Sequence, residues 1–251
     1  MSLLDVDGLT KTFGGLRALD DLSVAVDRGE LVGVMGPNGA GKSTFFNCVS
    51  GVVTPDAGRV TFDGRDVTGD PPETLAKSGL VRTFQQTREL ETMTVRDNVR
   101  LAAPDQRGER TLPALLRTSG MQDEERAVRE RADDLIAAFE LDHLRDEYSG
   151  ALSGGQRKLL ELARVLMLDP DLLLLDEPFA GVNPTLTNDI ADRVRGLNDD
   201  GMTVVIIEHE LETLTDLVDR LVVLQQGSLL VEGDPATVVE DPRVIEAYLG
   251  E

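Results

Sequence analysis

The stretch GPNGAGKST at residues 36 to 44 combines three glycines, a lysine and two hydroxyl side chains. Its spacing fits the pattern G-x-x-x-x-G-K-[ST]. Glycines let backbone N–H groups converge on a phosphate, the lysine reaches the outer phosphates, and the serine hydroxyl is a ligand for Mg²⁺. The sequence therefore predicts a cradle for nucleotide phosphates, formed by Gly36, Pro37, Asn38, Gly39, Ala40, Gly41, Lys42, Ser43 and Thr44.

The segments on either side of this loop agree with that prediction. An apolar run at residues 31 to 35 is typical of a buried strand, and residues 43 to 49 are expected to form a helix. The positive end of such a helix faces the anion. A glycine-rich turn that contains a lysine by chance is the alternative interpretation.

A second cluster of chemical groups follows the apolar run of residues 171 to 177, DLLLLDE. Ligands of α/β sheets bind at the carboxyl ends of the strands, where this run delivers two carboxylates. We expect Asp176 to hold a magnesium ion that bridges the outer phosphates, and Glu177 to orient and deprotonate the attacking water. Alternatively, the two acids cap the next element.

A third motif, LSGGQ at residues 152 to 156, precedes the strongly helical stretch RKLLELARVLML. A serine and two glycines at the start of a helix make a second anion-binding end, although an ordinary helix cap has the same residues. At this point the sequence resembles the ATP-binding cassette (ABC) ATPases, whose signature it matches letter for letter. The resemblance implies that Ser153, Gly154, Gly155 and Gln156 close over ATP held by the opposite subunit of a head-to-tail dimer.

The resemblance extends over essentially the whole chain and implies further roles. Gln85, in VRTFQ, is similar to the glutamine that senses magnesium and the water, and its neighbour Gln86 offers the alternative register. His209, directly after an apolar strand, is similar to the histidine that contacts the γ-phosphate and acts with Glu177. Phe13 matches the aromatic residue that stacks on adenine, and a core phenylalanine is its competing interpretation.

One departure from the family pattern lies in the segment AGVNP, residues 180 to 184. Many ABC ATPases have an aspartate where this chain has Asn183, so contacts between subunits at this point should rest on uncharged hydrogen bonds. This variant, with RTFQ, IIEHEL and the C-terminal VIEAYLGE, is similar to the ATP-binding subunits of branched-chain amino-acid importers. The cargo is an implication of that resemblance alone.

The elements that position these motifs follow from periodicity. The first 35 residues alternate as in an antiparallel sheet, and Asp63-Gly64 predicts the turn of a second hairpin. The pattern is helical from about 94 to 168, and afterwards strands at 171 to 176, 203 to 207 and 220 to 224 alternate with helices. The predicted fold is α/β: a P-loop NTPase core of the ABC ATPase type with a parallel sheet, an N-terminal antiparallel β subdomain and an inserted α-helical subdomain. We expect one domain, 1–251, with the insertion at approximately 86–165.

Composition narrows the function classes. The net charge of −21 opposes binding to nucleic acid or anionic lipid, so membrane contact should run through a protein partner. Only four of the 25 basic residues are lysines, a balance similar to proteins of salt-loving organisms, with an ordinary acidic surface as the alternative. No apolar run approaches the roughly 18 residues of a membrane helix, and no secretion signal is recognised. Cys48, the one cysteine, is expected to be a buried structural residue.

These observations lead to a hypothesis of an ATPase that binds ATP and Mg²⁺ and energises an importer for branched-chain or other hydrophobic amino acids. It would lie in the cytoplasm, peripheral on the inner face of the membrane. Its expected partners are a second cassette (the same chain or a paralogue), integral membrane permease subunits and, indirectly, an extracytoplasmic solute-binding protein, with no nucleic acid. The alternatives are a soluble ABC ATPase of iron–sulfur assembly or translation, and a nucleotide-binding regulator without turnover.

Overall fold

The structure is a computed structural model that describes residues 2–83, 90–104, 119–209 and 211–249. The chain divides into two compact units, and each is considered by itself. The first unit contains the residues up to position 85 and those from 170 onwards, and the second contains residues 86 to 169. Gln85 and Gln86, predicted from the sequence to respond to the nucleotide, lie outside the described residues.

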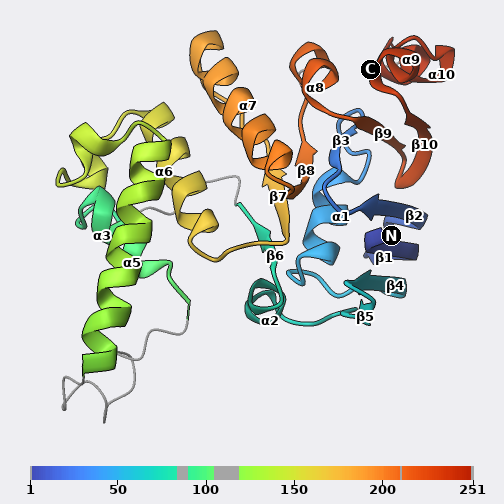
Figure 1. The fold of residues 1–251 in the computed structure, drawn as a ribbon. Coiled ribbons are helices and arrows are strands. Elements are labelled where there is room, and N and C mark those ends of the chain that lie inside the picture. Colours follow the sequence, from blue (N-terminus) through green and yellow to red (C-terminus); the bar gives the residue numbers. More distant parts are fainter. Residues whose placement is uncertain (1, 84–89, 105–118, 210, 250–251) are drawn as a thin grey trace. The chain divides into compact units, whose positions relative to one another are not determined.

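A six-stranded sheet organises the first unit (Figure 1), in the order β10-β9-β3-β8-β7-β6. Neighbours from β9 to β6 run parallel, and β10 is an antiparallel strand at one edge. All residues of the three central strands are buried, because helices and a second sheet cover both faces. Strand bounds are β3 Leu31–Met35, β6 Leu80–Arg82, β7 Leu172–Asp176, β8 Thr203–Ile207, β9 Arg220–Gln225 and β10 Ser228–Gly233.

A four-stranded antiparallel sheet, ordered β2-β1-β4-β5, forms the N-terminal part of the same unit. Its strands are β1 Ser2–Phe13, β2 Leu16–Asp27, β4 Ala57–Phe62 and β5 Arg65–Asp66. The predicted hairpin turn is confirmed: Asp63 and Gly64 both have positive φ, at 48° and 73°, as a two-residue turn between twisted strands requires. One apolar cluster joins this sheet to the larger one through Phe45 and Phe46 of helix α1.

Most helices of the first unit occupy connections between its strands, which confirms the predicted alternation, and α9 and α10 follow the last strand. After β3 comes α1, after β7 comes α7, and after β8 comes α8, as the order of elements in Figure 1 shows. Their bounds, with the remaining helices of this unit, are α1 Lys42–Val49, α2 Pro72–Lys77, α7 Pro184–Asp199, α8 Leu211–Leu217, α9 Pro235–Val239 and α10 Pro242–Leu249.

The regular structure of the second unit's described residues is helical, as the periodicity predicts, apart from one isolated β-bridge between Thr94 and Tyr148. Its α-helices are α3 Val95–Leu101, α5 Ser119–Ala138 and α6 Gly154–Leu166, and short 3-10 helices span Asp142–Leu144 and Ser149–Ala151. Buried Asn98 ties this unit together, since its amide group donates to the backbone oxygens of Leu90 and Thr94 and to Ser149 Oγ. In the described part of the chain, no helix is long and apolar enough to cross a lipid bilayer.

Candidate functional site

The predicted phosphate loop lies between the carboxyl end of β3 and the first residue of α1. Its bounding glycines are required by geometry. Gly36 and Gly41 have φ of 148° and 105°, and an added Cβ would stand 2.2 Å from Leu224 O at the first and 2.6 Å from Ala18 O at the second. The loop therefore folds into a tight turn against the strands beside it, a path that side chains at these two positions would obstruct.

Lys42 begins helix α1 and is buried, with 5% of its surface exposed. Its ammonium group donates to the carbonyl oxygens of Gly36 at 2.5 Å and Pro37 at 3.1 Å, so the lysine closes the loop over its own first residues. Ser43, the next residue, is exposed. The loop thus presents a hydroxyl to its surroundings and holds a positive charge inside its own curve.

Asp176 ends strand β7 and is buried against Arg82 at the end of β6. Arg82 Nη2 donates to Asp176 Oδ2 at 2.7 Å, and both side chains are less than one-tenth exposed. Arg82 Nη1 also donates to Asn47 Oδ1 and Ser50 Oγ, at 2.8 and 2.9 Å. The guanidinium therefore connects the carboxylate of β7 to the helix that follows the phosphate loop. The sequence offered one signal for this contact, the arginine of RTFQ, to which we assigned no role.

Glu177 and His209 meet where the neighbouring strands β7 and β8 end. His209 Nε2 lies 3.0 Å from Glu177 Oε1, so the structure brings together the two residues predicted from separate motifs. Glu177 has a positive φ of 50° and its backbone N–H donates to Ile207 O at 3.0 Å. The histidine side chain is 44% exposed and the glutamate 17%, which places the pair at an accessible surface.

Phe13 ends strand β1 and is 48% exposed, so the competing interpretation of a core phenylalanine is wrong. The Lys11 ammonium lies 5.5 Å from its ring centroid. An exposed aromatic ring in the first unit is available for stacking on a planar ligand. Cys48 is buried as predicted, and burial raises the pKa of its thiol to about 11, which keeps it protonated and unreactive at neutral pH.

The signature motif lies in the second unit, at the start of α6. Ser153 is the N-cap residue: its Oγ accepts from Gln156 N at 3.3 Å, and its own N–H donates to Gln156 Oε1 at 2.9 Å. This reciprocal pair is a capping box. Gly154 has no atom within 4 Å of an added Cβ, so the first turn is open. Asn183, the departure noted in the sequence, caps α7, where its Oδ1 accepts from Leu186 N at 3.0 Å.

Magnesium is the metal that the motifs imply. In the described ranges, no group of three or more His, Cys, Asp or Glu side chains is arranged to hold a metal ion. Magnesium bound with a nucleotide takes most of its oxygen ligands from phosphates and water, and one or two from the protein. The hydroxyl of Ser43 and the carboxylate of Asp176 are oxygen donors of the required kind.

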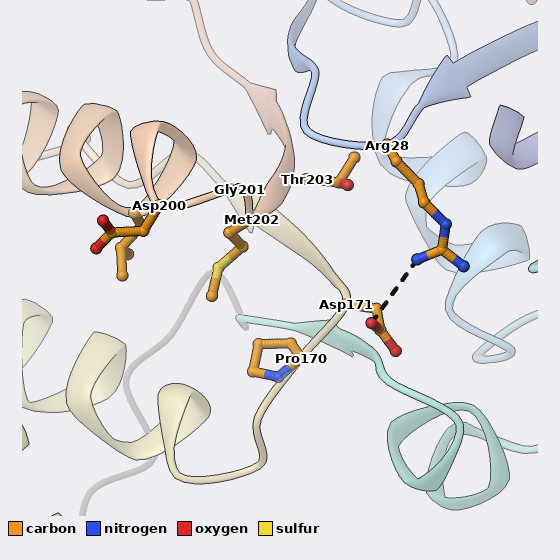
Figure 2. Close-up of a pocket in the computed structure, with 8 residues that line it drawn as sticks. Arg28, Pro170, Asp171, Asp200, Gly201, Met202 and Thr203 are labelled. Atoms are coloured by element: carbon orange, nitrogen blue, oxygen red, sulfur yellow. Dashed lines mark ion pairs between the residues drawn. The ribbon is translucent and has the colours of Figure 1, made fainter. Parts of the chain in front are cut away.

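A pocket in the first unit lies at the amino ends of the parallel strands, opposite the ends that carry the phosphate loop. It is lined by residues just before or at the amino ends of β3, β7 and β8, among them Arg28, Asp171 and Thr203. Figure 2 shows Arg28 turned toward Asp171, and their charged atoms are 3.9 Å apart. The phosphate loop, Asp176 and His209 all belong to the carboxyl ends of strands, so this pocket is separate from the candidate site.

The fold and the loop at the end of β3 define a P-loop nucleotide hydrolase. The ABC transporter family matches residues 19–180, and the branched-chain amino acid ATP-binding cassette transporter family matches residues 228–251. The chain therefore belongs to the ABC transporter family, as an ATPase that binds ATP.

Individual relatives match nearly end to end. The probable branched-chain amino acid transport ATP-binding protein LivG of Archaeoglobus fulgidus is 41% identical over 100% of this chain and 96% of its own length. The lipopolysaccharide export system ATP-binding protein LptB of Haemophilus influenzae is 36% identical over 100% and 98%.

Solved structures agree with the sequence relatives. The ADP conformation of MJ1267, an ATP-binding cassette of an ABC transporter, superposes with a TM-score of 0.87 at 40% identity, and all of both chains is covered. A dimeric bacterial ABC transporter cassette, MJ0796, gives 0.76 at 27% identity over 92% of this chain and 98% of its own.

Proposed function

We propose that this chain is the ATP-hydrolysing subunit of an importer for branched-chain or other hydrophobic amino acids. The observation that carries the catalytic part is the contact of 3.0 Å between His209 and Glu177, beside a phosphate loop that ends the adjacent strand β3. The cargo rests on a different support: the relatives named for branched-chain amino acid transport and the family match at residues 228–251.

The proposed division of labour follows from the chemistry of each residue. Backbone amides of residues 36 to 44 and the Lys42 ammonium bind the phosphates, and Phe13 stacks on the adenine. Ser43, Asp176 and Gln85 would hold Mg²⁺, which neutralises charge on the phosphate oxygens. Glu177 accepts a proton from the water that attacks the γ-phosphate, and His209 holds both Glu177 and the γ-phosphate in place.

In this proposal, productive closure needs a second cassette. Ser153, Gly154, Gly155 and Gln156 contact the γ-phosphate of ATP bound by the opposite subunit in a head-to-tail dimer. Such a dimer, formed with the same chain or a paralogue, would pass its closing motion to integral membrane permease subunits from the cytoplasmic face of the membrane. A solute-binding protein on the other side would deliver the amino acid.

The LptB relatives give a second candidate function, since their identity of 36% is close to that of the LivG relatives and also spans the whole chain. An exporter of lipids would use the same ATP chemistry. The C-terminal family match favours amino-acid transport over this candidate. The third possibility, a soluble ABC ATPase of iron–sulfur assembly or translation, has no relative named for it among those described above.

The catalytic part is tested with Glu177→Gln. Because this change removes the proton acceptor and keeps the shape, we expect turnover to fall by about 10²- to 10⁴-fold. ATP affinity, measured by isothermal titration, should stay within about twofold of the original value. The matched control is Glu73→Gln, an exposed carboxylate on α2 that should change neither quantity. Unchanged turnover in Glu177→Gln would remove this residue as the base.

The cargo is tested by transport. The chain would be co-expressed with the membrane proteins encoded next to it, and uptake of radiolabelled leucine into vesicles with internal ATP would be measured. We expect ATP-dependent uptake that Glu177→Gln abolishes. Stimulation of ATPase activity by lipopolysaccharide, without leucine uptake, would favour the export candidate instead.

A further inference from the structure

Glu208 is a buried carboxylate between the two turns that carry Glu177 and His209. It follows the last residue of β8 and is 3% exposed. Its Oε1 accepts from the backbone N–H of Phe179 at 2.7 Å, in the turn after β7. Its Oε2 accepts from the backbone N–H of His209 at 3.1 Å. The Glu208 side chain therefore links the turn after β7 to the turn after β8, and it uses one carboxyl oxygen for each turn.

The turn after β7 needs such support because its backbone is strained. Glu177 has a φ of 50°, a left-handed conformation that is unfavourable for a residue with a Cβ. It is kept there by the bond from its N–H to Ile207 O and by the bond from Ala180 N to Glu177 O, at 3.0 and 3.2 Å. The Phe179 N–H lies inside this turn, so its bond to Glu208 restricts the same few residues.

Burying a carboxylate is costly unless strong hydrogen bonds compensate, and bonds from backbone N–H groups to an ionised acceptor are among the strong ones. A small apolar residue after β8 would avoid that cost. The buried carboxyl group therefore needs a compensating benefit. The geometry indicates where this benefit lies, because one N–H group that it binds belongs to Phe179, two residues after Glu177, and another belongs to His209 itself.

We propose that Glu208 is a positioning residue for ATP hydrolysis, which sets Glu177 and His209 at their mutual distance of 3.0 Å. This inference rests on the proposed function, because it assigns Glu208 a role through those two residues. The competing explanation is a purely structural bond, which would contribute to stability and leave the rate per folded molecule unchanged.

The sharpest variant is Glu208→Gln, which has nearly the same shape. It converts one acceptor oxygen into an NH₂ group, so one of the two backbone N–H groups faces a donor and loses its partner. We expect kcat to fall about tenfold, because one buried unsatisfied N–H misaligns the turn. The KM for ATP and the ATP affinity should stay within about twofold, because the phosphate loop is untouched.

Thr203→Val is the matched control at the other end of the same strand. Thr203 is 1% exposed, and its Oγ1 accepts from Gly29 N at 2.9 Å, so this variant also removes a buried acceptor from a backbone N–H. We expect a melting temperature lowered by a few degrees, as for Glu208→Gln, with kcat unchanged. An equal loss of kcat in both variants, or in neither, would overturn the positioning role.

A double-mutant cycle separates positioning from general destabilisation. In a His209→Ala background, part of what Glu208 positions is already absent, so Glu208→Gln should then reduce kcat by less than about threefold. The same tenfold loss in both backgrounds would contradict the proposal. If Glu208→Gln does not fold, Glu208→Asp is the substitute. It keeps the carboxyl group but is one methylene too short to reach both amides, so kcat should again fall while the KM for ATP stays unchanged.

The failures of the two proposals are distinguishable. If Glu177→Gln leaves turnover intact, the proposed catalytic site is wrong whatever Glu208 does. If Glu177→Gln abolishes turnover while Glu208→Gln changes stability alone, the site stands and the positioning role of Glu208 is rejected.

Discussion

Two helices of this chain begin within a glycine-rich motif, and they satisfy their first turns in different ways. Helix α1 has Gly41 as its N-cap, in a left-handed conformation at φ 105°, and no side chain of the described residues caps it. Helix α6 has Ser153 as its N-cap, with both bonds of a capping box to Gln156. The start of α1 therefore leaves backbone N–H groups for a ligand. At the start of α6, in contrast, the Ser153 side chain already accepts from a backbone N–H of the first turn.

In the proposed function, this difference corresponds to two motifs that engage phosphate at different stages. The loop before α1 would be an anion site within one chain, with Lys42 already held inside it. At α6, Ser153 Oγ accepts from Gln156 N, which leaves its own O–H free to donate. The cap therefore orients a hydroxyl donor without needing a ligand, as expected of a surface that meets ATP only when a second cassette arrives.

The largest effect expected from this comparison is the loss of nucleotide binding in Lys42→Ala. Removing the ammonium deletes charge-assisted bonds worth about 1.5–3 kcal/mol each, so ATP affinity should fall by roughly 10- to 100-fold. Lys158→Ala, on α6, is the control and should leave binding to a single chain unchanged. Isothermal titration with a non-hydrolysable ATP analogue measures both, and equal affinities would contradict the cradle at α1.

The next effect concerns the free energy of unfolding, which alanine substitutions at Gly41 and Gly154 should change in different directions. Gly41→Ala should destabilise the fold by about 2 kcal/mol or more, because φ is positive and the new Cβ would meet Ala18 O at 2.6 Å. Gly154→Ala should be neutral or stabilise by up to about 0.5 kcal/mol, since nothing lies within 4 Å of its Cβ. Urea unfolding followed by circular dichroism measures both, and a Gly154→Ala chain as unstable as Gly41→Ala would show that the first turn of α6 is crowded.

The smallest effect concerns the capping box itself. Ser153→Ala removes the acceptor of Gln156 N and should cost about 1 kcal/mol of stability. ATP binding to the single chain should not change, because the motif belongs to the other helix start. Thermal unfolding with and without ATP provides the comparison, and a loss of ATP affinity would place Ser153 at the nucleotide of its own chain.

The parts of the fold that local chemistry determines were predictable. Apolar runs without polar interruptions indicated the buried strands β3, β7 and β8, and Asp63-Gly64 indicated a hairpin because few residue pairs tolerate two positive φ values. The phosphate loop followed from spacing alone. The antiparallel edge strand β10 is not predicted by the sequence, since its half-buried, half-apolar residues lack a clear period of two.

The supporting residues of the site were not predictable, because their partners are distant in sequence. Arg82 reaches Asp176 across 94 positions, and nothing about a lone arginine after an apolar run indicates that it will be buried. Glu208 belongs to the motif IIEHEL, yet its bond to Phe179 depends on the pairing of β7 with β8, which the motif does not reveal. Gln85, in contrast, was predicted from its motif and stays a prediction, outside the described residues.

The central claim is that ATP is bound between the loop before α1 of one cassette and the start of α6 of another. Sedimentation velocity of Glu177→Gln with ATP and Mg²⁺, compared with the same protein carrying Ser153→Arg, tests it most directly. The account predicts an ATP-dependent dimer for the first protein and a monomer that still binds ATP for the second. Dimers of equal stability in both, or no ATP-dependent association in either, would contradict it.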